Sequence, residues 1–120
     1  MNLSPYREQV LEHYRNPRHR GRLASPDRVG ELDNPVCGDQ VRIELQMDGE
    51  TVAGIAFDGE GCVIAIAAAS MLAEYAHGRS AAELRAMSQQ DVLAMLGVEL
   101  GYSRSRCALL ALEALQAALG

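Results

Sequence analysis

The sequence contains no lysine, because all 11 of its basic residues are arginines. Schiff-base enzymes and nucleotide-binding P-loops both depend on a lysine amine, so these classes of protein are excluded. Positive charge is also in deficit, and the formal net charge is -5 at pH 7. General nucleic-acid binding requires a basic surface that releases counterions from phosphates. We therefore expect no nucleic-acid partner.

Long apolar runs are absent as well. The longest covers residues 62–69, far short of the roughly 20 residues that cross a bilayer. The N-terminal segment lacks the basic and then apolar pattern of a secretion signal. These features predict a cytoplasmic protein that does not interact with membranes. Without a secretion signal, its 3 cysteines favour thiols, thiolate ligands or a nucleophile over a disulfide framework.

The chain has 120 residues, of which 48% are hydrophobic and 22% charged. This length is typical of one domain, and the apolar fraction is high enough to offset the entropy cost of folding. We expect residues 1–120 to form a single domain with one core. The sequence leaves open whether this domain is a monomer or a weak homo-oligomer.

The first half of the chain carries signals for one helix and a hairpin. Ser4 and Pro5 favour a helix start, and the Asn16–Pro17 pair ends that helix near Tyr14. Apolar residues alternate with polar ones over 41–47 and again over 53–57. This period of two predicts an antiparallel hairpin around an Asp-Gly turn, with a weaker third strand over 28–32.

The second half has the composition and capping residues of helices. Gly59, Glu60 and Gly61 are expected to form a turn before an alanine-rich helix that reaches about residues 77–78. A serine followed three residues later by an acidic residue opens two short helices, at Ser80 and at Ser88. A last helix is expected to begin near residue 103 or 105. The fold class is thus α+β, with a small antiparallel sheet of three strands packed against an N-terminal helix and a C-terminal set of helices.

The three cysteines all fall at predicted junctions between elements. Cys37 lies in a loop before the first long strand, Cys62 ends the next turn, and Cys107 opens the final helix. A helix N-terminus has a partial positive charge that stabilises a thiolate. Asp39 adds a carboxylate beside Cys37, giving three sulfur ligands and one oxygen ligand suited to zinc or iron.

A structural role explains the same residues equally well at this point. Each cysteine could be a small buried hydrophobic residue and Asp39 a turn residue. The spacing of the cysteines matches no zinc-finger pattern. A third alternative is a cysteine hydrolase with His13, His19 or His77 as its base, but no cysteine-histidine signature accompanies any of these residues.

Several other residues have both a structural and a functional interpretation. The arginines before the sheet either face an acidic partner or belong to a solvated loop; they are Arg15, Arg18, Arg20, Arg22 and Arg28. His13 and Tyr14 are expected to pack beneath the first helix, and the methionines at 71, 87 and 95 to fill the core. Arg106, beside Cys107, either stabilises a thiolate or is simply exposed at a helix start.

Four segments together closely resemble the iron–sulfur cluster scaffold family of NifU N-terminal, IscU and SufU proteins. They are residues 13–21, 34–39, 59–62 and 105–111. The match keeps the order of the family's motifs and spans nearly the whole chain. The resemblance implies the family's sandwich of a small sheet against helices. It also implies that Cys37, Asp39, Cys62 and Cys107 are the ligands.

The resemblance further implies two related activities. As a scaffold, the protein would accept sulfur from a cysteine desulfurase, bind iron and assemble a transient [2Fe-2S] cluster for apo iron–sulfur proteins. As a SufU-type sulfurtransferase, it would hold zinc at the same ligands and accept persulfide sulfur. Cys37 is our candidate for the attacking thiol, because its glycine-flanked loop is expected to be mobile. Whether the protein is an enzyme therefore depends on which activity it has.

The motifs do not assign the chain to one branch of the family. The Gly-Glu-Gly lead into Cys62 and the basic residue before Cys107 resemble SufU, but that branch's insertion before the third cysteine is missing. IscU has a proline-rich chaperone-recognition motif and a histidine before its third cysteine. This chain has residues 98–102 and Arg106 at those places, so chaperone-driven cluster release by the IscU route is not expected.

Overall fold

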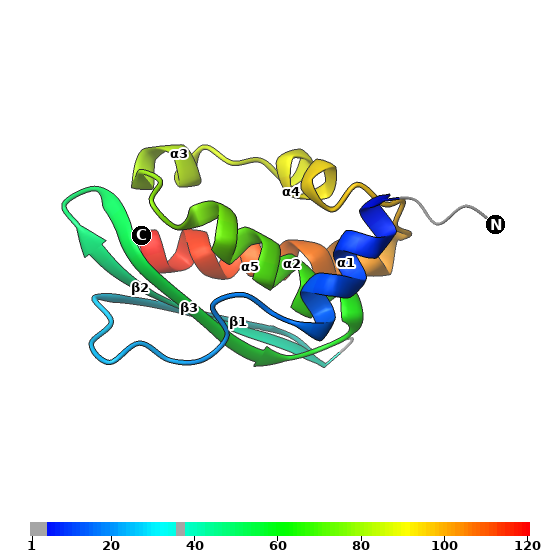
Figure 1. The fold of residues 1–120 in the computed structure, drawn as a ribbon, viewed down its shortest axis with the longest axis horizontal. Helices are drawn as coiled ribbons and strands as arrows, with labels where there is room; N and C mark the ends of the chain where they lie inside the picture. Colours follow the sequence, from blue (N-terminus) through cyan, green and yellow to red (C-terminus); the bar gives the residue numbers. More distant parts are fainter. Residues whose placement is uncertain (1–4, 36–37) are drawn as a thin grey trace.

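The computed structural model describes residues 5–35 and 38–120. The elements in chain order are α1 (Pro5–Arg15), β1 (Arg28–Asn34), β2 (Asp39–Asp48), β3 (Thr51–Glu60), α2 (Val63–Ala76), α3 (Ala81–Arg85), α4 (Gln89–Leu96) and α5 (Tyr102–Leu119). The strands form one antiparallel sheet in the order β1-β2-β3. Figure 1 shows α2 and α5 lying along one face of this sheet, with α3 and α4 beyond them and α1 beside α2. The predicted α+β class is confirmed.

The central strand β2 shows why the sheet forms where the alternation predicts it. Its side chains at Val41, Ile43 and Leu45 point to one face and are at most 1% exposed. A tight turn joins β2 to β3, and Gly49 there has a φ of 62°, which favours glycine. The predicted hairpin is confirmed, and the weaker strand forms the edge of the sheet as β1.

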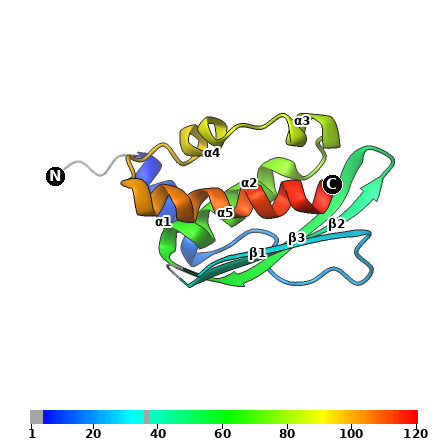
Figure 2. The same ribbon diagram turned by 180° about the vertical axis from the view of Figure 1, so that it is seen from behind.

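The core lies between the sheet and the two long helices. Leu72 of α2 and Leu115 of α5 are almost fully buried against the inward side chains of the sheet. Gly30 lets β1 approach α5 closely, because a Cβ at this position would overlap the backbone at Ala114 and Ala118. Figure 2, which views the molecule from the opposite side, shows α5 running along β1.

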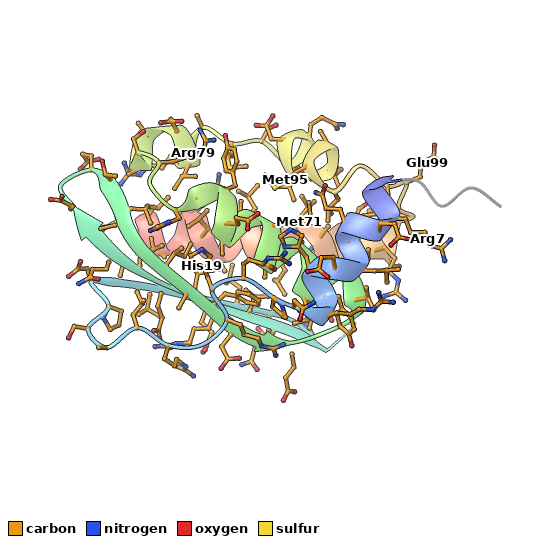
Figure 3. All side chains as sticks on the ribbon, in the orientation of Figure 1. Arg7, His19, Met71, Arg79, Met95 and Glu99 are labelled. Carbon is orange, nitrogen blue, oxygen red and sulfur yellow. The ribbon has the colours of Figure 1, made fainter. Side chains whose placement is uncertain are left out.

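The two short helices begin as their capping residues predict. The Ser80 side chain accepts the backbone N–H of Glu83, and Ser88 forms a complete capping box with Asp91. The helix α4 then ends at Gly97, which has a φ of 69°. Figure 3 shows Met71 and Met95 in the space between α2 and α4, where both belong to one hydrophobic cluster. Met87 is likewise partly buried against the main core, so the prediction for the three methionines is confirmed.

Two predicted boundaries near the cysteines are wrong. The strand β3 continues through Glu60, so Gly59 and Glu60 belong to the strand and not to a turn. The final helix begins at Tyr102 with Gly101 as its N-cap, before either expected start. Gly101 offers no side-chain cap, and its carbonyl accepts the Ser105 N–H at 2.9 Å. A sequence search for capping side chains misses such a start.

The first helix is held to α2 by a buried polar cluster. The Ser70 hydroxyl oxygen accepts the backbone N–H of Arg18 at 2.7 Å and lies 2.7 Å from His13 Nδ1. Burial, followed by the Arg18 guanidinium, lowers the pKa of His13 below its ordinary value of 6.5. The predicted packing of His13 is confirmed. Tyr14 is 42% exposed, because the next residue along a helix points to a different side.

The arginine-rich segment after α1 crosses the outer face of the sheet. Residues 19–21 run beside β3, with the Gly21 N–H donating to the Phe57 carbonyl at 2.8 Å and the Phe57 N–H to the His19 carbonyl at 2.9 Å. Three of its arginines contact carboxylates within the chain: Arg18 reaches Glu12, Arg20 reaches Asp58, and Arg22 reaches Glu44. Arg28, the first residue of β1, donates to the Leu119 carbonyl. These contacts attach the segment to its own fold.

Glu44 is the anchor of this segment, although it lies on the outward side of β2. Its side chain is 4% exposed. Its carboxylate accepts the Leu23 N–H at 2.8 Å, Arg42 Nε at 2.9 Å and Arg22 Nη1 at 3.2 Å. The backbone hydrogen bond from Leu23, followed by the hydrogen bonds from the two arginines, lowers the pKa of Glu44 below 4.5.

We expect Glu44→Gln to lower the free energy of unfolding by about 2 kcal/mol at neutral pH, because hydrogen bonds to a buried charge are lost. The folded pKa of Glu44 is depressed, so this stabilisation is present above 4.5 and is lost as the pH falls through the folded pKa. Urea unfolding at a series of pH values measures the difference. Glu31→Gln is the control, because this half-exposed partner of Arg42 should contribute less than about 1 kcal/mol. The difference in unfolding free energy between the wild type and Glu44→Gln should shrink at acidic pH. If it stays the same there, the charge of Glu44 is not what stabilises the fold.

Candidate metal centre

Three elements meet at the end of the sheet where β2 begins and β3 ends. Asp39 is the first residue of β2, Cys62 is the N-cap of α2, and Cys107 lies on α5. Their ligand atoms, one carboxylate oxygen and two sulfurs, all lie within 4.8 Å of one another. Asp39 and Cys107 are buried, whereas Cys62 is partly exposed. The fold thus brings together three residues that are far apart in the sequence.

The group borders an open cavity of about 420 Å³. Its lining residues are Gly38, Asp39, Gly61, Cys62, Ser103, Arg104 and Cys107. Because Asp39 and the two cysteines line a cavity that opens to solvent, a metal ion can reach them from outside. Cys37, the remaining predicted ligand, lies outside the described residues.

Asp39 is positioned by its neighbours on the next element. Its Oδ1 accepts the backbone N–H of Cys62 at 3.2 Å. Gly61 leaves the space for this contact, because a Cβ there would lie 2.8 Å from Oδ1 and 2.9 Å from the Ala65 Cβ. The sequence predicted a turn at Gly61. It could not predict that Gly61 lies against the Asp39 carboxylate, because this contact depends on how closely β2 approaches α2.

The two described cysteines differ in their relation to the helices. Cys62 is the N-cap of α2 and so precedes the first turn of that helix. Cys107 is the sixth residue of α5, beyond the first turn in which the helix dipole is effective. The prediction that Cys107 lies at a helix N-terminus is therefore wrong. Cys107 belongs to the site because it lies on the face of α5 that lines the cavity.

The donor set fits a soft or borderline metal. Metal–sulfur bonds of about 2.3 Å and metal–oxygen bonds of about 2.1 Å are typical of zinc, so one ion can nearly span the described ligand atoms. Thiolates also suit the irons of an iron–sulfur cluster. In the described chain, this ligand group contains no histidine. None of the three histidines named for the hydrolase alternative therefore belongs to this group.

The basic residue beside the thiols is Arg104 and not Arg106. Arg104 lines the cavity with both described cysteines. Arg106 is exposed and lines a separate cavity with Pro35, Leu110 and other residues. The sequence drew attention to Arg106 because it adjoins Cys107, but neighbours along a helix point in different directions. Residues three apart share a face, and that spacing could have identified Arg104.

Residues 5–120 match the family model described as the NifU-like N-terminal domain. The chain belongs to this family. The resemblance seen in the four sequence segments is thereby confirmed. Within residues 5–35 and 38–120 of this NifU-like domain, no helix combines the length and apolar character needed to cross a membrane.

Relatives of this NifU-like domain carry two kinds of name. The zinc-dependent sulfurtransferase SufU of Bacillus subtilis is 33% identical over 92% of this chain and 86% of its own length. The iron–sulfur cluster assembly scaffold protein IscU of Escherichia coli K12 is also 33% identical, over 95% of this chain and 91% of its own.

A solved structure supports the fold. The crystal structure of the N-terminal part of a nitrogen-fixing NifU-like protein from Brucella abortus matches with a TM-score of 0.81 and 24% identity. The match covers 95% of this chain and 91% of that one. This NifU-like domain therefore has the family's arrangement of a three-stranded sheet against helices.

Proposed function

We propose that this NifU-like domain is a scaffold that assembles a transient [2Fe-2S] cluster. It accepts sulfur from a cysteine desulfurase, binds iron, and passes the cluster to apo iron–sulfur proteins. Cys37, Asp39, Cys62 and Cys107 hold the cluster in this proposal. The observation that carries it is the convergence of one carboxylate and two thiols within 4.8 Å, at a cavity that opens to solvent.

The chemistry of the ligands suits temporary binding. Thiolates bind both iron and sulfane sulfur well, whereas a hard carboxylate oxygen is a weaker partner for a cluster iron. The iron held by Asp39 thus offers the bond that an acceptor's thiol exchanges most readily. A scaffold requires this combination, because it must hold its cargo during assembly and then release it.

A zinc-dependent sulfurtransferase is the second candidate, and the similarity to a relative of that name supports it. Two bonds of about 2.3 Å to one ion reach at most about 4.6 Å, so a single ion nearly spans the three described donors. Zinc bound there would keep the cysteines as thiolates. One thiol, which we propose to be Cys37, would take the outer sulfur of the donor's persulfide.

Metal and sulfide analysis separates the two candidates. The protein is produced together with its desulfurase and purified without oxygen, and iron, zinc and acid-labile sulfide are measured per chain. Iron with matching sulfide supports the scaffold, whereas one zinc without sulfide supports the sulfurtransferase. Mass spectrometry of the same sample shows whether Cys37 carries added sulfur. A Cys107→Ser control should lose the metal, and a wild-type protein with neither metal nor added sulfur would contradict both candidates.

A further inference from the structure

Arg104 occupies a special place on α5. It stands three residues before Cys107, and Ser103 stands four residues before it, so all three share one face of the helix. This face lines the cavity that also contains Asp39 and Cys62. Among the described residues that line the cavity, Arg104 is the only basic one. The site therefore combines acidic ligands with a single positive charge.

The Arg104 guanidinium is not committed to structural contacts within the described chain. The arginines of the segment over the sheet are bound to carboxylates or carbonyls. Arg104, in contrast, is exposed, and its side chain forms no ion pair with any described residue. Because a guanidinium stays charged at all physiological pH values, it presents a positive charge at the cavity that an incoming anion can use.

An anionic sulfur is the group that must enter this cavity if the protein accepts sulfur. A guanidinium is weakly hydrated and polarisable compared with an ammonium group, so it pairs well with a large anion. We propose that Arg104 receives the terminal sulfur of the donor's persulfide at the cavity mouth and directs it toward the acceptor thiolate. This inference rests on the proposed function, and it concerns a substrate-positioning residue and not a metal ligand.

The transfer step conserves atoms and charge. The donor enters as the anion R–S–S⁻ paired with Arg104, and it takes the proton of the acceptor thiol to become R–S–SH. The acceptor thiolate then attacks the outer sulfur of R–S–SH, forming a new sulfur–sulfur bond as the donor's own sulfur–sulfur bond breaks. The donor leaves as R–S⁻ and takes the proton from the new protein persulfide, which remains as Cys–S–S⁻. Arg104 offers this product anion its counter-charge. Arg106 cannot replace it, because Arg106 lines a different cavity.

The test compares Arg104→Gln with Arg106→Gln, a matched loss of one exposed arginine from the same helix. Each protein is loaded with sulfur from two donors, the desulfurase with cysteine and the small molecule glutathione persulfide. Protein persulfide is counted by mass spectrometry at increasing donor concentrations. Metal content and thermal unfolding are measured on the same samples.

We expect Arg104→Gln to lower loading at subsaturating donor by about tenfold with both donors, mainly by raising the donor concentration needed for half-maximal loading. Arg106→Gln should match the wild type, and Arg104→Lys should restore part of the loss. A loss with the desulfurase alone would assign Arg104 to docking of the partner protein and overturn the inference. Loss of metal from Arg104→Gln would overturn it too, as would full loading of that variant. A wild-type protein that loads from neither donor would refute the proposed function itself.

Discussion

Replacing Asp39 by alanine is expected to slow transfer of an assembled [2Fe-2S] cluster to an apo-ferredoxin by about tenfold or more, a barrier increase of about 1.4 kcal/mol. In the proposed scaffold, the carboxylate is the hard oxygen ligand, and its bond to iron is the one that an acceptor thiol displaces first. Three thiolates would then hold the cluster without this readily exchanged bond. Transfer is followed by the visible absorption or circular dichroism of the cluster as it moves to ferredoxin.

Asp48→Ala is the control for this experiment, because Asp48 is exposed at the opposite end of the same strand. Its transfer rate should equal that of the wild type. The Asp39 variant also separates the two candidate functions. Loss of an oxygen ligand weakens zinc binding, so a zinc protein should lose affinity, whereas a scaffold should retain its cluster longer. An unchanged transfer rate would refute the assignment of Asp39 as the releasing ligand.

Gly61→Ala is expected to weaken zinc binding by about tenfold although it removes no ligand, since groups that support ligands typically contribute factors of 10 to 100. The added Cβ would lie 2.8 Å from Asp39 Oδ1 and 3.1 Å from Asp39 Cγ. The carboxylate is the flexible partner in this contact, so it must move away and lose the Cys62 N–H. Competition with a chromogenic chelator measures the affinity.

Gly101→Ala provides a matched glycine substitution near the same site. A Cβ on Gly101 has no heavy atom within 4 Å, and its φ of -69° is ordinary for alanine. The change costs up to about 1 kcal/mol of stability because alanine is a poor N-cap, but metal affinity should stay at the wild-type value. If both variants bind metal equally well, Asp39 is not held in place by the space at Gly61.

Local signals in the sequence were sufficient for most of the fold. The alternation over 41–47 predicted a strand because one face of a sheet must be buried, and the strand forms there with Ile43 in the core. Ser80 and Ser88 predicted helix starts because their hydroxyls satisfy N–H groups that the helix leaves free. The start of α5 was missed because Gly101 has no such side chain.

Contacts between distant segments decided what these local signals could not. Glu44 has the position of a solvated strand residue, yet it is buried because the segment carrying Leu23 folds over it. Arg18, Arg20 and Arg22 likewise form ion pairs with Glu12, Asp58 and Glu44, which lie on other elements. In each case the outcome depends on which segment packs against which, and no local pattern of hydrophobicity encodes that choice.

The sequence by itself determined the candidate ligands, the family and nearly all the helices and strands. It did so because thiols, carboxylates, capping residues and hydrophobic periods act over a few residues. Only the tertiary structure decided that Asp39, Cys62 and Cys107 lie within 4.8 Å of one another, and that Arg104 faces them in place of Arg106. These facts depend on the register of the sheet and the rotation of α5 about its axis, which packing of the whole core sets.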